Sequence, residues 1–315
     1  GPNGERFEST EKLIPFVEGE LYFADLSVKI PDPQLWWPNG YGKPELYHLE
    51  LSFRTAAGES DQARLRFGMR EIRYGLTLLD SSGHLRRLEY APASAPGAAV
   101  VDVSHEGMLE SSEGWVASLK RGAESSPAIR PLEDRAVSPM MVVRVNGVRI
   151  ALKGGNWGIS DSRKRVSRER LEPYIRLTRD ANFTIIRNWC GQSMEEVLFE
   201  LCDEYGILVW NDFWSSTQDH SLEAGDLQLF RENARDTLLR FRHHASIVLW
   251  CGENEGVPSP ARNEALEALV REIDGTRYYS PNSRRVNLQA SGPWRHGEPV
   301  EFFTDRGRGF STELG

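Results

Sequence analysis

The sequence predicts a multidomain α and β protein in which a (β/α)8 barrel follows a β-sandwich. Three observations lead to this prediction. Short alternating strand patterns, separated by Gly and Pro, occupy residues 20–74. From residue 141 on, apolar strand-like runs alternate with amphipathic helical patterns, which is typical of a parallel sheet covered by helices. Polar and aromatic residues follow several of these strands, at the edge where a barrel builds its active site.

The sandwich is expected over residues 1–75. Its strand candidates are Glu20–Ile30, Leu46–Phe53 and Ala63–Phe67, separated by the turn-rich stretch Trp36–Gly42 and by Gly58. Residues 76–140 change character, because Ala91–Gly97 and Arg121–Pro127 have loop composition without periodicity. We therefore expect an inserted or loosely ordered region there.

The barrel is expected over residues 141–315, truncated after its seventh strand. The predicted strands are Met141–Val145, Ile150–Leu152, Thr184–Ile186, Ile207–Trp210, Ile247–Trp250 and Arg285–Leu288. The predicted helices are Arg168–Arg179 with Ser167 as N-cap, Met194–Tyr205, Leu227–Arg242 and Arg262–Ile273. No Gly-rich phosphate loop opens the first helix, which argues against a dinucleotide-binding fold.

The amino-acid composition argues against several classes of binding partner. The net charge is -8 with both signs mixed, and no basic stripe predicts binding to nucleic acid. No apolar run has the length of a membrane span, and localisation and oligomeric state stay open. The three cysteines form no C-x-x-C and no H-E-x-x-H occurs, so we expect no metal or other cofactor, and we expect the cysteines to be buried.

Tryptophan is abundant, with nine residues. Five of them follow strand-like segments: Trp157, Trp189, Trp214, Trp250 and Trp294. A single tryptophan is best explained as core packing. Several at equivalent strand ends favour a carbohydrate site, since the flat indole face fits a sugar ring.

Two acids flank an amide in "WCGENEG", directly after the apolar run Ile247–Leu249. Retaining glycoside hydrolysis needs two carboxyls about 5–5.5 Å apart, one as acid and one as nucleophile. Glu255 is the first candidate. A second glutamate with similar surroundings, Glu313, lies in "GFSTELG". For Glu253 a solvated loop position is slightly favoured over a contact with substrate.

Several motifs in order resemble family 2 glycoside hydrolases, in their β-mannosidase-like branch. They are "LWWPNGYGKPELY", "FGMREI", "VNGVRIALKGGNWGISD", "FTIIRNWCG", "LCDEYGILVWNDFW", "LRFRHHASIVLWCGENE" and "GFSTELG". The resemblance implies an immunoglobulin-like sandwich before a TIM barrel, and a retaining enzyme acting on β-linked oligosaccharides or glycosides, above all β-mannosides. The family's N-terminal sugar-binding sandwich has no counterpart here, so we expect a piece of a longer protein.

The resemblance also implies roles for individual residues. Glu255 would be the acid/base, Glu313 the nucleophile and Asn254 the ligand of the sugar 2-hydroxyl. The positions that match the sugar-binding subsite are Asp161, Trp189, Trp210 and Asp212, and the strand-end tryptophans Trp157 and Trp294 are further candidates. Arg187 is expected beside the nucleophile, where a cation favours an ionised carboxylate, and Trp214 or Trp294 beside Glu255.

Several alternatives stay open at this point. Within the family they are an exo-β-glucosaminidase, a β-galactosidase and a β-glucuronidase. From another class they are a non-catalytic carbohydrate-binding relative and an inactive fragment.

Overall fold

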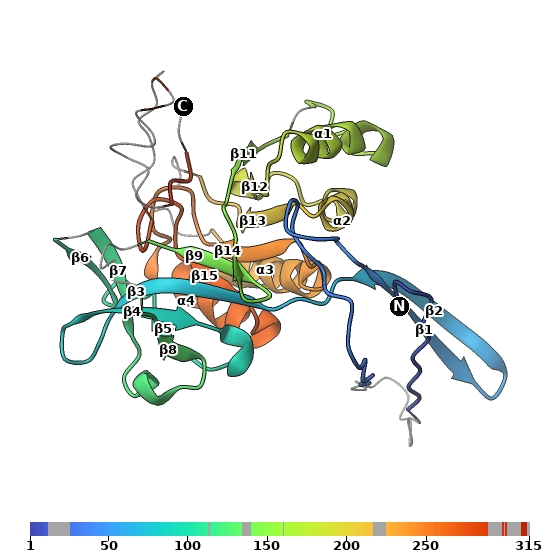
Figure 1. Cartoon of the computed structure of the whole chain (residues 1–315), viewed down its shortest axis with the longest axis horizontal. Coiled ribbons are helices and arrows are strands. Elements are labelled where there is room, and N and C mark those ends of the chain that lie inside the picture. Colours follow the sequence, from blue (N-terminus) through green and yellow to red (C-terminus); the bar gives the residue numbers. More distant parts are fainter. Residues whose placement is uncertain are drawn as a thin grey trace.

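The computed structural model describes residues 1–11, 26–112, 114–133, 140–159, 161–216, 225–288, 298, 300 and 310–313 (Figure 1). Strands in these ranges form three sheets: a two-stranded hairpin, a mixed eight-stranded sheet and a parallel five-stranded sheet. No helix in the described ranges has the length and apolarity that a membrane span requires.

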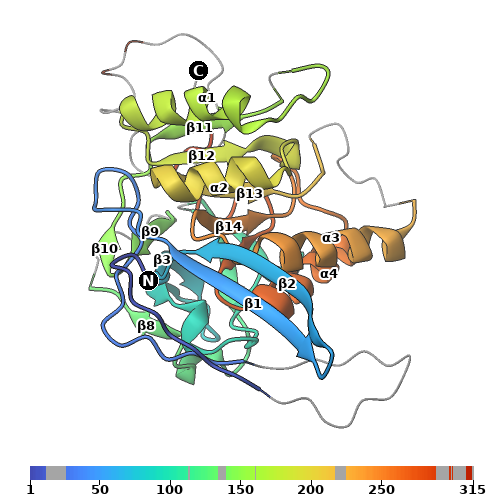
Figure 2. The same ribbon diagram turned by 90° about the vertical axis from the view of Figure 1, so that its right-hand side faces the viewer.

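The five-stranded sheet is entirely parallel, in the order β11-β12-β13-β14-β15. Its strands are β11 (Gly154–Trp157), β12 (Ile185–Asn188), β13 (Leu208–Asp212), β14 (Ile247–Cys251) and β15 (Tyr278–Ser280). The helices between them are α1 (Arg168–Asp180), α2 (Glu196–Tyr205), α3 (Leu227–Phe241) and α4 (Pro260–Leu269), with the π-helical turn η5 (Val270–Asp274) after α4. Figure 2 shows α1, α2 and α3 on one side of this sheet. Within the described residues these strands form part of a barrel wall, and the wall does not close.

Burial explains why the sequence pattern predicted the central strands. Every residue of β12, β13 and β14 is buried, so each strand contains an apolar run, which is followed by polar residues within β12 and β13. The strand predictions at these three places are confirmed, and the four predicted helices are present with ends displaced by up to four residues. Ser167 precedes α1 as predicted, but its side chain makes no capping hydrogen bond.

Other strand predictions need correction. Met141–Val145 corresponds to β9 (Val142–Val145), which pairs with strands of the eight-stranded sheet and not with the barrel strands. Ile150–Leu152 is not a strand. Arg285–Leu288 is not a strand either, because Val286 and Asn287 have φ of 55° and 61°. Their apolar pattern reflects burial in a loop, and the fifth parallel strand is instead the short β15.

The described part of residues 76–140 contains strands. Together with β9, it contributes to the eight-stranded sheet. The strands of that sheet are β3 (Ile72–Leu79), β4 (Leu85–Tyr90), β5 (Val101–Asp102), β6 (Met108–Ser111), β7 (Gly114–Leu119), β8 (Ile129–Pro131), β9 and β10 (Val148–Arg149). The stretches with loop composition contain the short 3-10 turns η1 (Pro92–Ser94) and η2 (Ala123–Ser125) that connect these strands. Short strands joined by such turns lack the length that makes periodicity visible.

Asn287 joins the eight-stranded sheet to the loop after β15. Its side-chain amide exchanges two hydrogen bonds with the backbone of Thr77, at 2.5 and 3.0 Å. Its backbone N–H donates to Trp115 O and its backbone oxygen accepts from Met141 N. Tyr74 of β3 also donates its hydroxyl hydrogen to Val248 O, inside β14. The two sheets therefore share a buried polar and aromatic contact and do not form separate lobes.

The N-terminal part contains a hairpin of β1 (Tyr47–Thr55) and β2 (Gly58–Phe67). These strands confirm the predictions at Leu46–Phe53 and Ala63–Phe67, and Figure 1 shows the hairpin extending away from the other sheets. Trp36, from the turn-rich stretch before it, is fully buried and donates its indole N–H to Asp203 O of α2. The predicted strand Glu20–Ile30 lies mostly outside the described residues, and residues 26–30 carry no strand.

Candidate active site

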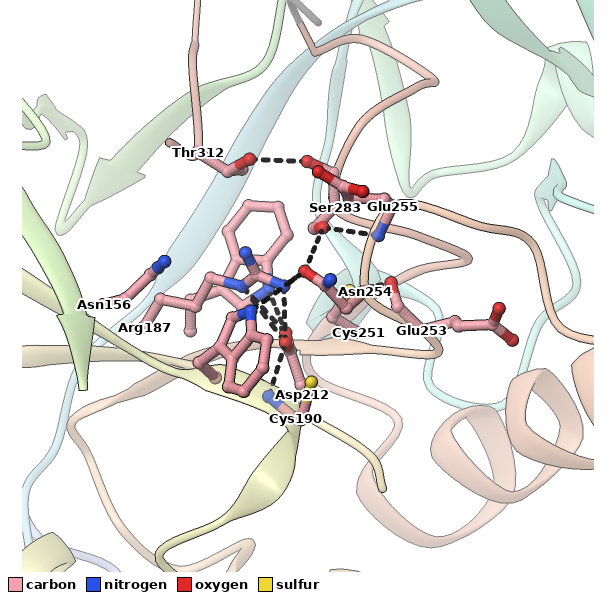
Figure 3. A network of polar contacts seen from close by, with 12 residues as sticks. Asn156, Arg187, Cys190, Asp212, Cys251, Glu253, Asn254, Glu255, Ser283 and Thr312 are labelled. Carbon is pink, nitrogen blue, oxygen red and sulfur yellow. Dashed lines mark hydrogen bonds and ion pairs between the residues drawn. The ribbon is translucent and has the colours of Figure 1, made fainter. Parts of the chain in front are cut away.

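Arg187 is the centre of a polar network at the carboxyl ends of the parallel strands (Figure 3). It lies near the end of β12, and its guanidinium forms a forked ion pair with Asp212 at the end of β13. The closest distance, between Nη2 and Oδ2, is 2.6 Å, and Nε lies 3.1 Å from the same oxygen. Both side chains are almost completely buried. Burial opposes the charge of Arg187, but the adjacent Asp212 carboxylate outweighs it and raises the pKa of Arg187 above its usual value. A permanent cation is therefore fixed at this edge of the sheet.

Arg187 also contacts two residues that lie outside the strands. Its Nη1 lies 2.9 Å from Oε1 of Glu313, and its Nη2 lies 2.7 Å from Oδ1 of Asn254, in the loop after β14. The contact that we expected between Arg187 and Glu313 is thus present. Asn156 of β11 donates to the same Oε1 at 3.2 Å. The Glu313 carboxylate is held by two donors from two neighbouring strands.

The orientation of the Asn254 amide follows from its partners. Its Oδ1 accepts from Arg187 and, at 3.1 Å, from the indole N–H of Trp189. Both are groups that only donate, so the atom they contact must be the amide oxygen. The amide nitrogen of Asn254 consequently lies on the other side of the group from Arg187.

Asp212 and Trp210 support this network through buried hydrogen bonds. Asp212 accepts from the Trp210 indole N–H at 2.8 Å and from the backbone N–H of Cys190 at 3.0 Å, in addition to Arg187. It is fully buried, and Trp210 is 1% exposed and stacked on Phe310. The structure gives both residues a supporting position, and their predicted contact with a sugar stays a prediction.

Glu255 occupies a strained backbone turn. Its φ is 60°, and the N–H of Gly256 donates to Asn254 O at 2.7 Å across it. A three-residue turn with positive φ at its centre is the rarer and less favourable γ-turn. Such a conformation costs about 1–3 kcal/mol and persists only where the surroundings enforce it.

Ser283 links this turn to the segment that carries Glu313. Its Oγ accepts from the backbone N–H of Glu255 at 2.9 Å, and its backbone oxygen accepts from Thr312 Oγ1 at 2.6 Å (Figure 3). Ser283 is fully buried. One residue therefore contacts the backbone of Glu255 and the side chain next to Glu313. The predicted short separation of the two carboxyls stays a prediction.

Asp161 and Trp157, two of the predicted site residues, lie apart from the Arg187 network. Asp161 is paired with Arg165 at 2.5 Å, and this hydrogen bond lowers the pKa of Asp161 to about 2. It lines a small pocket together with Trp157, whose indole N–H donates to Ser193 Oγ at 3.2 Å. No hydrogen bond within the described ranges joins Asp161 to Arg187. Trp294 lies outside the described residues.

The expectation that Glu253 is a solvated loop acid is wrong. Its side chain is fully buried and forms an ion pair with Arg262 of α4 at 3.1 Å. Figure 3 shows Glu253 directed away from Asn254 and Arg187. The sequence could not reveal this, because the partner lies on a helix whose rotation about its axis is not set by the loop.

The cysteines behave as predicted, since Cys190, Cys202 and Cys251 are all free and buried. In the ranges that the structure describes, no group of three or more His, Cys, Asp or Glu side chains could hold a metal ion. Sequence reasoning did not select Asn156 and Ser283 as site residues. Asn156 was visible as a polar residue at a strand end, whereas Ser283 carries no recognisable signal.

Comparison with known proteins gives the family. The family model described as "Glycosyl hydrolases family 2" matches residues 2–70, and "Glycosyl hydrolases family 2, TIM barrel domain" matches residues 140–289. The chain belongs to glycosyl hydrolases family 2. Its fold class is accordingly the family's immunoglobulin-like domain and TIM barrel domain, of which the described residues show five barrel strands.

Similar proteins carry mannosidase names. A mannosylglycoprotein endo-β-mannosidase from Lilium longiflorum is 28% identical over 97% of this chain and 30% of its own length. A β-mannosidase B from Thermothelomyces thermophilus is 30% identical over 94% of this chain and 30% of its own length. The crystal structure of a β-D-mannosidase from Dictyoglomus thermophilum matches with a TM-score of 0.54 and 26% identity, over 82% of this chain and 27% of that one. The chain thus spans about 30% of the length of the curated relatives that align with nearly all of it.

Proposed function

We propose that the protein containing this chain is a retaining glycoside hydrolase that cleaves β-mannosides. The observation that carries the proposal is the position of Arg187, which binds both the Glu313 carboxylate and the amide oxygen of Asn254. The Glu313 carboxylate is thereby held in a fixed position, as an attacking nucleophile requires. The three relatives named above support the sugar, since they are 26–30% identical over most of this chain and are mannosidases.

Glu313 is assigned the role of nucleophile. Oε1 already accepts from Arg187 and Asn156, so we assign the attack on the anomeric carbon to Oε2. The new bond between Oε2 and the anomeric carbon forms as the bond from that carbon to the leaving oxygen breaks. The product is a glycosyl ester of Glu313.

Glu255 is assigned the role of acid and base. In the first step its carboxyl proton passes to the leaving oxygen as the glycosidic bond breaks. In the second step it takes a proton from water, which attacks the anomeric carbon and releases Glu313. The amide nitrogen of Asn254, turned away from Arg187, is assigned the contact with the sugar 2-hydroxyl.

A panel of aryl β-glycosides tests the proposal in the full-length protein. We expect turnover of the β-mannoside, and faster hydrolysis of a β-glucosaminide, β-galactoside or β-glucuronide would support the corresponding relative instead. Glu313→Gln should abolish turnover of every substrate. Glu255→Gln should lower kcat/KM by about 10²–10⁴-fold on substrates with poor leaving groups and spare kcat/KM on those with good ones, because kcat/KM reports the first step and only poor leaving groups need protonation there.

Glu264→Gln is the matched control, because Glu264 is an exposed glutamate on α4. It should retain the parent's rate on every glycoside. A folded protein that hydrolyses none of these glycosides would refute the enzymatic proposal and favour a carbohydrate-binding relative.

A further inference from the structure

The γ-turn that contains Glu255 needs external support. A residue with a side chain at φ of 60° has a more favourable conformation available, so neighbouring groups must hold it there. The chain directly after β14 is closely packed at Gly252, since a Cβ there would lie 2.3 Å from the hydroxyl oxygen of Tyr279. Glu253 is the first side chain after this closely packed position.

The Glu253–Arg262 pair anchors this path to α4. The guanidinium of Arg262 binds Oε2 of Glu253 through Nη2 at 3.1 Å, and Oγ of Ser215 through Nη1 at 3.1 Å. Ser215 in turn accepts the backbone N–H of Asn254 through its own backbone oxygen, at 3.1 Å. Arg262 thus contacts the residue before Asn254 and a residue that hydrogen-bonds Asn254 itself.

Both members of the pair are buried, Glu253 completely and Arg262 to 6% exposure. A buried ion pair is a poor way to gain stability, because two apolar residues of similar volume often serve as well or better. What an ion pair adds is direction, since the forked guanidinium fixes the angle as well as the distance of its partners. The loop after β14 carries the site residues Asn254 and Glu255, and a contact of fixed angle would orient this loop.

We propose that Glu253 and Arg262 are positioning residues that set the carboxyl of Glu255 for proton transfer. The proposal rests on the proposed function, because it assigns them an effect on the acid/base step. They touch no reacting atom. Loss of the pair does not remove the Glu255 carboxyl, but it lets the backbone turn at Glu255 relax. The carboxyl then protonates the leaving oxygen less effectively. Attack by Glu313, which is held by Arg187 and Asn156, does not depend on the pair.

The test compares two β-mannosides in the full-length protein. A 2,4-dinitrophenyl glycoside needs almost no protonation of its leaving group, whereas a phenyl glycoside needs it. Glu253→Gln leaves the Arg262 charge buried without its counterion and can fail to fold. The double variant Glu253→Gln, Arg262→Gln removes both charges and keeps two groups able to hydrogen-bond each other. For each protein kcat/KM is measured on both substrates.

We expect the double variant to lose roughly 10-fold or more on the phenyl mannoside, a part of the full contribution of a general acid. On the dinitrophenyl mannoside it should stay within about threefold of the parent. The matched control is Glu267→Gln, Arg271→Gln, which removes a second Glu–Arg pair joining α4 to η5, at 3.2 Å. That control should leave the ratio of the two rates unchanged.

Two results would overturn the proposal. One is an equal loss on both mannosides, which a merely structural role predicts, and the other is a double variant as fast as the parent on the phenyl mannoside. A parent protein inactive on both mannosides would instead refute the proposed function, and this inference with it. The parent's own rate therefore separates the two failures.

Discussion

Arg187 and Glu313 are 126 positions apart in the sequence, and their side chains form an ion pair of 2.9 Å between Nη1 and Oε1. The same guanidinium binds Asp212 and Asn254. Four segments from different parts of the chain therefore meet at one cation. Because the carboxyl ends of parallel strands share one edge, a residue near the end of β12 can contact the neighbouring strand end and the loops beyond it.

Arg187→Met should reduce turnover of every glycoside. Without the guanidinium, the Glu313 carboxylate and the Asn254 amide oxygen both lose the group that holds them in place. Arg187→Lys, which keeps a charge but loses the fork, should reduce turnover less. Measurement of kcat/KM on the phenyl mannoside checks this. If the Met variant is as fast as the parent, Arg187 does not act on the nucleophile.

Ser283→Ala should lower kcat/KM on glycosides with poor leaving groups. It removes the oxygen that accepts the N–H of Glu255 and leaves that N–H without this acceptor, at a cost of about 1–3 kcal/mol to the turn. Ser246→Ala is the matched control, since Ser246 is also buried and its Oγ has no hydrogen-bond partner in the described part of the chain. A Ser283 variant that matches the Ser246 variant on a phenyl glycoside would contradict a role for Ser283 in the site.

Asp274→Asn should destabilise the protein at neutral pH and weaken its acid sensitivity. Burial opposes the charge of Asp274, but Arg277 and two further side chains outweigh it and hold the pKa of Asp274 below its usual 3.8. A depressed folded-state pKa stabilises the protein above about pH 3.8, and this contribution disappears as the pH falls through the folded value. Loss of the carboxylate leaves Arg277 buried without its partner, which costs about 3–5 kcal/mol.

Urea unfolding of the Asp274 variant and the parent between pH 7 and pH 2 provides the measurement. The two curves should converge as the pH falls. A constant difference across the whole range would show that the charge of Asp274 does not contribute to stability.

Dialysis of the full-length enzyme against a chelator should leave its activity unchanged, because two carboxylates perform the whole reaction without a metal. The activity is assayed on the same aryl mannoside before and after dialysis, and again after addition of Mg²⁺, Ca²⁺ or Zn²⁺. Activity that is lost on chelation and regained with one of these ions would require a different mechanism.

The sequence predicted the central barrel strands because these strands are buried on both faces and read as apolar runs. It failed where burial occurs without regular structure, as at Val286, and where strands are very short, as in β5 and β15. In both cases the pattern of apolar residues reports contact with the core and not backbone conformation.

The site was predictable to a similar degree. The contact between Arg187 and Glu313 could be expected, because Arg187 follows a predicted barrel strand and the family resemblance implies that Glu313 is the nucleophile. The partner of Glu253 could not, since it depends on which way α4 turns Arg262. Ser283 was equally hidden, because its role depends on a loop conformation that no local signal specifies.

The four hydrogen bonds of Asn287 limit which segments of this chain can be removed or exchanged by protein engineering. Residues 76–133 look like a removable insertion, yet Thr77 and Trp115 supply the partners of a buried asparagine that lies four positions after Ser283. Excision would remove those partners, leave the side chain of Asn287 without them, and release the loop after β15 along with the serine that it carries. The eight-stranded sheet and the parallel sheet should accordingly melt as one cooperative unit, and a swap of this segment between relatives would alter catalysis without exchanging any residue that contacts substrate.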